Sequence, residues 1–558
     1  MKEKLKEALA IALEGAHVGA GDIPLEHPTE LENGDYSSGV ALQRAKRAAM
    51  APRTLAEFVV SQLGTIEGVS KIEVAGAGFI NFYLTPAALA EAVETARKED
   101  MWGSGTLNAG KKIMVEYTDP NPFKEFHIGH LMSNAIGESI ARLMQFSGAD
   151  VKRANYQGDV GPHVAKAIWG VEKLGVDPHD SAQLGKAYAA GAQAYESDAA
   201  TKAEIDALNA KVYDRSDPKI NKIYDAGRKA SLTHFEELYK ILGTKFDYSF
   251  FESETAPRGL TIVKKHPKVF EESDGAVVFK GEKVGLHTRV FVTSKGLPTY
   301  ETKDLGLAQM KSETWPFDQS ITVTANEQSD YFKVVLAAMK EVLPDVASKV
   351  RHISHGMMRF AEGKMSSRTG NVITGESLLT DLTEAAKVRA AESRADNADI
   401  LAQQIAVAAI KYQILKQASG KDIIFDRERA LSLEGDSGPY LQYAHARAHQ
   451  LVEKAGSEGV ALRFPKGDAL GIPESANELV RLLHRFPESV EYAAAHSEPH
   501  LLTNYLLEFA AAFNSWYAQV HVLDGTPEAA HKVALVDAVR RTLKNGLWIL
   551  GIPAPEKM

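Results

Sequence analysis

A strand and a helix meet in the stretch Ile113–Met144, IMVEYTDPNPFKEFHIGHLMSNAIGESIARLM. Its first residues, Ile113–Tyr117, are a short apolar run that predicts a strand. Apolar residues then recur at steps of three and four, which predicts a helix that begins near the histidines. The loop Thr118–Phe126 therefore delivers His127 and His130 to the N-terminus of that helix.

Such a helix N-terminus favours anions, because its first backbone N–H groups are free and its dipole is positive there. Gly129 lets the backbone approach a ligand closely, and the imidazoles of His127 and His130 add donors that are aimed the same way. By itself the HIGH tetrapeptide is equally compatible with part of a metal site or with a loop whose polar groups are satisfied internally.

A second motif, Gly363–Asn371 (GKMSSRTGN), follows much later in the chain. It places two cations, Lys364 and Arg368, among hydroxyls that include Ser366. Such a loop suits closure over a triphosphate and stabilisation of charge on a departing pyrophosphate. A basic, serine-rich loop is usually only solvated surface, but its pairing with the HIGH motif in this order favours an ATP-dependent adenylating enzyme.

Length and composition limit the possibilities. A chain of 558 residues should hold more than one domain, because single cores stop growing near about 250–300 residues. The absence of cysteine excludes disulfides, thiol nucleophiles and cysteine-ligated metal sites. The formal charge of −9 argues against a protein coated in nucleic acid, but not against a local basic surface that docks one folded RNA.

The sequence gives no sign of a membrane or secretory segment. No stretch approaches the length of a membrane span, and Met1–Lys6 leads into a charged amphipathic helix instead of the apolar core of a secretory signal. We therefore expect a cytoplasmic protein without membrane contact. We also expect a monomer with no protein-bound structural metal.

The pattern of elements predicts three domains. Residues 1–105 read as a small α/β unit, with helices and strands expected at Lys2–Glu14, Val40–Ala49, Thr54–Leu63, Ile72–Ala75 and Phe79–Leu84. Residues 106–375 alternate strands with helices, as a Rossmann-like, doubly wound parallel sheet requires, with strands expected at Ile113–Tyr117, Arg289–Thr293, Ser320–Thr324 and Arg351–Met357.

Helical sequence interrupts and then follows this sheet. Charged amphipathic segments at about 172–240 predict a helical insertion into the catalytic domain. Residues 376–558 predict an all-α bundle, with helices expected at Ile405–Leu415, Tyr440–Ala455, Ala476–Leu483, Tyr492–Val522 and Glu528–Leu550.

The two motifs resemble the signature pair of class I aminoacyl-tRNA synthetases, and further stretches narrow this to arginyl-tRNA synthetases. In chain order these stretches are GDYSS (Gly34–Ser38), VAGAGFINF (Val74–Phe82), VEYTDPN (Val115–Asn121), GDVG (Gly158–Gly161), GPYLQYAHAR (Gly438–Arg447) and APEKM (Ala554–Met558). The first two resemble the family's tRNA-core-binding domain, and the next two resemble its catalytic domain. GPYLQYAHAR resembles the opening of its anticodon-binding domain, and APEKM resembles its C-terminal ending.

The resemblance implies ATP-dependent ligation of L-arginine to its tRNA through an arginyl-adenylate, with release of AMP and pyrophosphate. The carboxylate of arginine attacks the α-phosphate of ATP, and the arginyl group then passes to the terminal ribose of the tRNA, so no protein nucleophile is needed. The resemblance also implies Mg²⁺ as the counter-ion of ATP and a need for tRNA in the activation step.

Roles for individual residues follow from the resemblance as well. Catalysis would rest on His127, His130 and Lys364. The other ATP contacts implied are Gly129, Gly356, Met357, Ser366 and Arg368. A guanidinium pairs best with a carboxylate, and the residues implied for arginine are Tyr300 and Asp304, four apart on one helical face, together with Glu116, Asn121 and Gln328.

Two positions depart from the family pattern. Ser367 stands where the class signature carries a second lysine, and the hypothesis is that Lys124, in the loop before the HIGH motif, shares that work with Lys364. The alternative is an exposed loop lysine without a role. Asp119 stands where the family commonly has a small hydroxyl residue, and its carboxylate could bind the ammonium of the substrate or cap the following loop.

The C-terminal helices carry candidates for tRNA binding, since unpaired bases stack on aromatic faces and accept hydrogen bonds along their edges. The candidates are Tyr440, Tyr443, His445, Arg447, Trp516 and Tyr517. Most aromatic residues in a helical bundle are core, as expected for Phe513 and Trp548.

Two other functions stay open. One is a different amino-acid specificity within class I, for example lysine. The other is a catalytically silent RNA-binding relative or scaffold, against which the intact His127, His130 and Lys364 speak.

Overall fold

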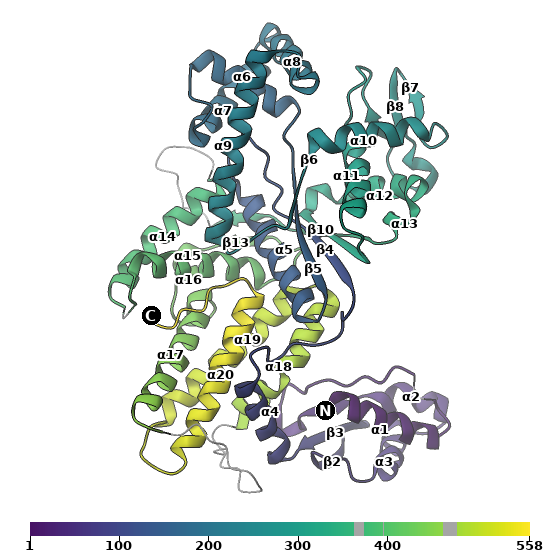
Figure 1. Ribbon diagram of the computed structural model, residues 1–558. Coiled ribbons are helices and arrows are strands. Elements are labelled where there is room, and N and C mark those ends of the chain that lie inside the picture. Colours follow the sequence, from purple (N-terminus) through teal and green to yellow (C-terminus); the bar gives the residue numbers. More distant parts are fainter. Residues whose placement is uncertain (20, 362–372, 394, 461–476) are drawn as a thin grey trace. The chain divides into compact units, whose positions relative to one another are not determined.

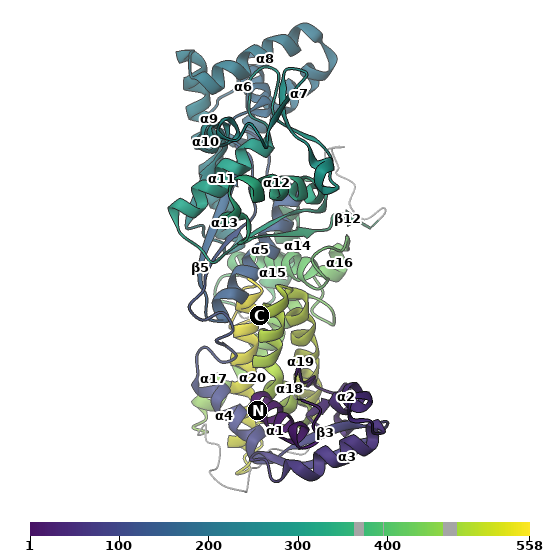
Figure 2. The same ribbon diagram turned by 90° about the vertical axis from the view of Figure 1, so that its right-hand side faces the viewer.

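The computed structural model describes residues 1–19, 21–361, 373–393, 395–460 and 477–558 (Figures 1 and 2). The chain forms two compact units, each built from segments that are distant in the sequence. The first comprises Met1–Gly103, Arg447–Pro487 and Glu508–Leu543. The second comprises Ser104–Ala446, Glu488–Leu507 and Lys544–Met558.

The first unit begins with a small antiparallel sheet of order β1-β3-β2 and its helices. These elements are α1 (Lys2–Gly15), η1 (Leu31–Asn33), β1 (Tyr36–Ser38), α2 (Val40–Ala48), α3 (Pro52–Leu63), β2 (Val69–Ala75), β3 (Phe79–Leu84) and α4 (Pro86–Lys98). Gly76 and Gly78 turn the chain between β2 and β3 with positive φ angles of 51° and 130°. The sequence analysis did not predict β1, which has three residues, or α4.

The second unit contains a five-stranded parallel sheet of order β11-β10-β4-β5-β6. Its strands are β4 (Lys112–Glu116), β5 (Asp150–Gln157), β6 (Tyr248–Phe251), β10 (Gln319–Ala325) and β11 (Val350–His355). The chain leaves β4 toward β5 and β6, then returns to the other side of β4 with β10 and β11. Ligands of such sheets bind at the carboxyl ends of the strands where the order reverses, here beside β4. The predicted Rossmann-like fold is confirmed.

Helices connect these strands. They are α5 (Ile128–Phe146), α6 (Pro162–Leu174), α10 (Glu252–Lys265), α11 (Tyr300–Thr314), α12 (Ser329–Val342) and α13 (Pro344–Ala347), with the short turns η2 (Gly281–Val284) and η3 (Asn326–Gln328). Apolar side chains of the central strands, such as Ile113, Val115, Ile321 and Val323, are fully buried beneath them. This continuous burial is what a parallel sheet covered on both faces requires.

The expected strand Arg289–Thr293 exists but was wrongly assigned to the parallel sheet. It is β9 (Arg289–Val292), and it joins β7 (Glu271–Ser273) and β8 (Ala276–Phe279) in a separate antiparallel sheet of order β7-β8-β9. A tight turn at Asp274 and Gly275, both with positive φ, makes β7 and β8 a hairpin, which then offers its edge to β9.

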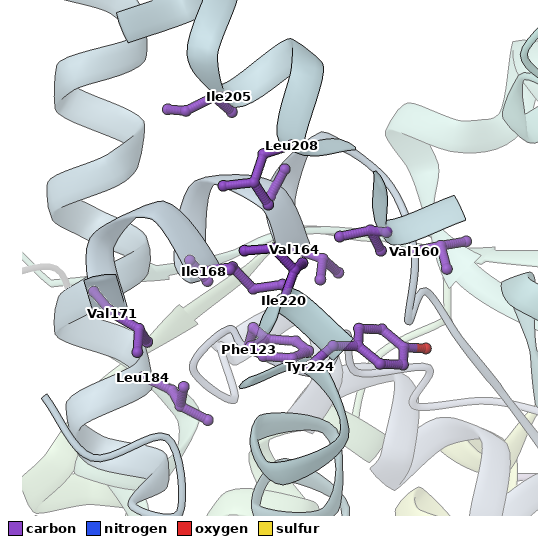
Figure 3. Close-up of a cluster of buried hydrophobic side chains, with 14 residues drawn as sticks. Phe123, Val160, Val164, Ile168, Val171, Leu184, Ile205, Leu208, Ile220 and Tyr224 are labelled. Atoms are coloured by element: carbon purple, nitrogen blue, oxygen red, sulfur yellow. The ribbon is translucent and has the colours of Figure 1, made fainter. Parts of the chain in front are cut away.

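A helical insertion follows α6. It consists of α7 (Ser181–Ser197), α8 (Ala199–Asp214) and α9 (Pro218–Leu242), and each of these helices starts at an aspartate whose carboxylate accepts backbone N–H groups. Gly170 and Gly191 let α6 and α7 approach closely, because an added Cβ would lie 2.0 Å from a carbonyl oxygen of the other helix. The insertion has its own apolar core, shown in Figure 3.

The described residues from Met358 onward are almost entirely helical. Its elements are β12 (Met358–Phe360), α14 (Gly375–Ala391), α15 (Ala398–Leu415), β13 (Ile423–Phe425), α16 (Arg427–Ala430), α17 (Gly438–Ser457), α18 (Asn477–His496), α19 (Pro499–Gln519) and α20 (Ala529–Ile549). The expectation of one helix over Tyr492–Val522 is wrong. The helix breaks at Ser497, whose φ is 56°, and restarts at Pro499, which suits a first helical position because it lacks an N–H group.

Candidate active site

A cavity of about 430 Å³ opens in the second unit at the carboxyl end of the parallel sheet. It brings together nine of the residues that were singled out from the sequence, although they come from three separate parts of the chain. These residues are Glu116, Asp119, Asn121, His127, Gly129, His130, Tyr300, Asp304 and Gln328. The HIGH motif and the residues to which the resemblance assigns arginine therefore line one cavity.

The HIGH motif lies at the N-terminus of α5, as the sequence predicted. His127 is the N-cap residue, and its backbone N–H donates to Nδ1 of His130 at 3.2 Å. The two imidazoles stack with their ring centroids 3.5 Å apart. Burial lowers the pKa of His127, and it lowers the pKa of His130 well below its ordinary value, with the positive charge of Lys124 acting in the same direction. At neutral pH these imidazoles are uncharged hydrogen-bonding groups.

The loop that leads into the motif is held in an uncommon conformation. Thr118, Asp119 and Phe123 have positive φ angles of 79°, 46° and 68°. Non-glycine residues adopt such angles at a cost that surrounding contacts must offset, and they cluster at functional sites. The contacts are present here: the N–H of Thr118 donates to Oγ of Ser133 at 3.0 Å, and the N–H of Phe123 donates to Oγ of Ser231 at 2.9 Å.

Asp119 and Asn121 connect this loop to the end of β5. Oδ1 of Asp119 accepts the N–H of Tyr156 at 2.7 Å, and Oδ1 of Asn121 accepts the N–H of Gly158 at 3.0 Å. Asp119 thus binds the neighbouring strand and does not cap the loop that follows it. Burial raises the pKa of Asp119 well above its ordinary value, and the negative charge of Glu116 raises it further.

Two buried ion pairs lie in the wall of the cavity, and of their four members only Glu116 was singled out from the sequence. Glu116 Oε2 lies 2.9 Å from Nζ of Lys311, and Glu252 Oε2 lies 2.5 Å from Nζ of Lys303. All four side chains are at most 6% exposed. Removing one member of such a pair leaves the other as an uncompensated buried charge, so these lysines keep the acidic wall in place.

Asp304 has no cation within ion-pair distance among the residues that the structure describes. Its Oδ2 accepts a hydrogen bond from the hydroxyl of Tyr331 at 2.5 Å. Burial raises the pKa of Asp304 to about 8, and Glu116 and Glu252 act in the same direction. A half-buried carboxylate in this environment gains most from a cationic ligand. Tyr300, one turn earlier on α11, is 59% exposed and lines the same cavity.

Three sequence candidates lie beside the cavity instead of in its lining. Nζ of Lys124 lies 5.1 Å from the ring centroid of Tyr188. Gly356 and Met357 follow β11, and their N–H groups donate to the carbonyl of Ser419 and to Oδ1 of Asp422. The preceding residue, His355, does line the cavity. Lys364, Ser366 and Arg368 lie outside the described residues.

The tRNA-binding candidates divide into half-buried and buried side chains. In the second unit, Tyr440 and Tyr443 are half-buried, but His445 is 1% exposed and its Nδ1 lies 2.9 Å from the carbonyl of Pro555. In the first unit, Arg447 donates to Oδ1 of Asn514, and Trp516 is 4% exposed beside Phe513. The predicted RNA contacts of His445 and Trp516 are therefore wrong, because both side chains are buried in the helical packing.

The described residues show neither a metal site nor a membrane-spanning helix. Within the ranges given above, no group of three or more histidine, aspartate or glutamate side chains is arranged to hold a metal ion. In the same ranges no helix is both long and apolar enough to cross a membrane.

Three family models match successive parts of the chain. The model of the class I tRNA synthetase (R) catalytic domain matches residues 93–427. The model of the arginyl tRNA synthetase N-terminal domain matches residues 1–84, and that of the DALR anticodon binding domain matches residues 441–558. The catalytic-domain match includes every residue of the cavity described above.

Relatives and solved structures agree with these matches. An arginine–tRNA ligase of Treponema denticola is 31% identical over 96% of this chain and 95% of its own length, and one of Streptococcus suis is 30% identical over the full length of both. The match to the solved arginyl-tRNA synthetase of Thermus thermophilus covers 100% of this chain and 100% of that protein, with 27% identity and a TM-score of 0.83. That of Plasmodium falciparum, 20% identical with a TM-score of 0.79, shares the fold. The chain belongs to the arginyl-tRNA synthetase family.

Proposed function

We infer that this chain catalyses the ATP-dependent attachment of L-arginine to its tRNA through an arginyl-adenylate. The supporting observation is that one cavity combines a helix N-terminus, which favours anions, with a half-buried carboxylate, Asp304, that lacks a cationic partner among the described residues. The first feature suits the phosphates of ATP, and the second suits a guanidinium. The family match supports the same substrates.

The residues divide the work between the two substrates. His127, Gly129 and His130 bind the phosphates, and the neutral imidazoles donate hydrogen bonds to oxygens that gain charge as pyrophosphate leaves. Asp304 binds the guanidinium, with Tyr300 beside it and Glu116 behind it. The α-amino end of arginine meets the contacts assigned above to Asn121 and Gln328, with Asp119 as a further candidate for its ammonium.

The remaining assignments extend the same function. Together with Lys124, the loop residues Lys364, Ser366 and Arg368 act on the triphosphate. Gly356 and Met357 contact the adenine side of ATP. Mg²⁺ accompanies ATP as its counter-ion. Tyr440, Tyr443 and Arg447 contact the tRNA, whose binding is needed for activation. The protein works as a cytoplasmic monomer with the three domains 1–105, 106–375 and 376–558.

The direct test is the transfer of radiolabelled arginine to tRNA. The purified protein should charge tRNA with arginine and not with lysine. An Asp304→Asn variant keeps the shape but removes the charge, so kcat/KM for arginine should fall about 100-fold, which corresponds to about 3 kcal/mol for a lost charge-assisted contact. Charging with lysine, or no charging of any tRNA, would contradict the proposal.

A further inference from the structure

The apolar core of the helical insertion extends into two loops of the active site. Figure 3 shows Phe123 and Val160 within the same cluster as Ile168, Leu208 and Tyr224. Phe123 belongs to the loop that leads into the HIGH motif, and Val160 belongs to the loop after β5 that contains Gly158. The rings of Phe123 and Tyr224 stack with their centroids 6.1 Å apart. Insertion and site therefore share one packed interior.

Helix α9 makes the polar contacts that accompany this packing. It runs from the other insertion helices toward the body of the second unit (Figure 1), and its buried stripe includes Tyr224, Gly227 and Ser231. Ser231 accepts the N–H of Phe123, and a Cβ on Gly227 would lie 2.3 Å from the ring of Phe123. One turn of α9 is thus fitted against the strained loop that carries the HIGH motif.

The second contact of α9 is with Asp159, which is 0% exposed. Its Oδ2 accepts from Nε of Arg228 at 2.9 Å and from the hydroxyl of Tyr224 at 3.2 Å, both on α9. Its two oxygens also accept from the N–H of Ser253 at 2.9 Å and from Oγ of Ser253 at 2.8 Å. One carboxylate therefore joins α9 to the first turn of α10.

The neighbours of Asp159 and Ser253 in the sequence are cavity residues. Gly158 precedes Asp159, lines the cavity and donates its N–H to Asn121. Glu252 precedes Ser253, lines the cavity and pairs with Lys303. Displacing Asp159 would therefore move Gly158 and Glu252, the wall on the arginine side of the cavity. Displacing Phe123 would move Lys124, which follows it directly, and the entry to the HIGH motif, both of which are assigned to the phosphates.

We propose that α9 is a positioning element for both substrates, through Asp159 and Arg228 for the arginine wall and through Ser231 and Phe123 for the phosphate loop. This inference rests on the proposed function, because it uses the division of the cavity between arginine and ATP. Neither Arg228 nor Ser231 lines the cavity, so each is a positioning residue.

The test is ATP–pyrophosphate exchange by the full-length enzyme with tRNA present, in which KM is measured separately for arginine and for ATP. Arg228→Gln should raise KM for arginine about 10-fold with less than a twofold change in KM for ATP, because a charge-assisted hydrogen bond to Asp159 is lost. Ser231→Ala should instead raise KM for ATP with little change in KM for arginine, because it leaves the N–H of Phe123 without its acceptor.

Three further variants distinguish a positioning effect from a general loss of folding or activity. Lys219→Gln, also on α9, removes an exposed ion pair with Glu172 and should leave both KM values unchanged. Arg228→Lys keeps the charge and should recover part of the loss. Ser253→Ala weakens the other side of Asp159 and should raise KM for arginine, which keeps the proposal testable if Arg228→Gln does not fold.

The outcomes separate the two hypotheses. A raised KM for arginine alone in Arg228→Gln and a raised KM for ATP alone in Ser231→Ala, both at unchanged melting temperature, would support α9 as the positioning element. Equal shifts of both KM values in both variants, or no shift in either, would overturn it. If the unmodified enzyme showed no arginine-dependent exchange, the proposed function itself would fail.

Discussion

The hydroxyl of Tyr331 donates a hydrogen bond of 2.5 Å to Oδ2 of Asp304, and it joins helix α12 to helix α11 across the cavity wall. Among the described residues Asp304 Oδ1 has no hydrogen-bond donor, so this oxygen is available to a ligand. The bond fixes the orientation of the carboxylate and favours its ionised form. Under the proposed function, this orientation suits a guanidinium.

Replacing Tyr331 with phenylalanine should weaken the binding of arginine. The variant loses one hydrogen bond to a charged group, worth about 1.5 kcal/mol, so KM for arginine should rise about 10-fold. The control is Tyr195→Phe, which removes a comparable hydroxyl–carboxylate bond to Asp206 in the insertion. Exchange assays with varied arginine measure both, and an unchanged KM in Tyr331→Phe would show that Asp304 needs no such orientation.

Asp304 should also make the substrate-free protein less stable as the pH rises. Its pKa of about 8 in the folded protein lies above its ordinary value near about 4, so the native state holds an extra proton between these pH values. Stability from this group therefore declines with increasing pH across that window. Asp304→Asn lacks the decline, and its melting temperature relative to the parent should rise by about 2 °C or more between pH 5 and pH 8. A constant difference would contradict this.

The same titration should appear in substrate binding. A guanidinium pairs with the ionised carboxylate, so arginine must displace the proton of Asp304 at neutral pH. KM for arginine should fall as the pH increases from 7 to 9, whereas KM for ATP should follow a different profile. Equal pH profiles for the two substrates would indicate that another group controls the pH dependence.

Lys124 should contribute to catalysis although it does not line the cavity. Its charge lowers the pKa of both His127 and His130, so its electrostatic effect reaches the N-terminus of α5 where the phosphates are proposed to bind. Lys124→Ala should slow arginine-dependent exchange about 10-fold, as expected for one lost charge contact to the transition state. Lys166→Ala is a matched control, because Nζ of Lys166 lies 4.1 Å from the ring centroid of Tyr195. Equal rates for Lys124→Ala and the parent enzyme would remove the hypothesis that Lys124 replaces a loop lysine.

Lys411 gives a prediction about stability alone. Its Nζ is fully buried and donates to the carbonyls of Leu242 and Gly551, and burial lowers its pKa to about 7. The native state then holds fewer protons than the unfolded chain between pH 7 and about 10, so stability from this group rises with pH in that window. Lys411→Met should lose this rise, which chemical unfolding at pH 7 and pH 9 would detect. Parallel pH dependence in both proteins would contradict a buried, titrating lysine.

Local patterns were sufficient to predict the central part of the site. The apolar run of β4, the strained loop and the periodic helix α5 lie next to one another in the sequence, so His127 and His130 could be placed from spacing alone. The positions of Lys303 and Lys311 could not be predicted in this way. Their buried partners, Glu252 on α10 and Glu116 on β4, come close only when these elements pack against α11. Their helical context was visible, but their burial depends on tertiary contacts.

Pairing and burial account for the other differences. The apolar run at Arg289 predicts a strand, yet nothing in it specifies whether the partner is the parallel sheet or the hairpin of β7 and β8. His445 and Trp516 lie on amphipathic helices whose packed faces depend on neighbouring helices. By contrast, the glutamate–proline pair at Glu498 and Pro499 was a usable signal for the break between α18 and α19.

ATP–pyrophosphate exchange with arginine, run with and without the tRNA for arginine and with lysine as the control amino acid, is the most direct test of the proposed function. We expect exchange with arginine when tRNA is present and none with lysine. Exchange with lysine, or no exchange with arginine under either condition, would contradict the assignment of the cavity to arginine activation.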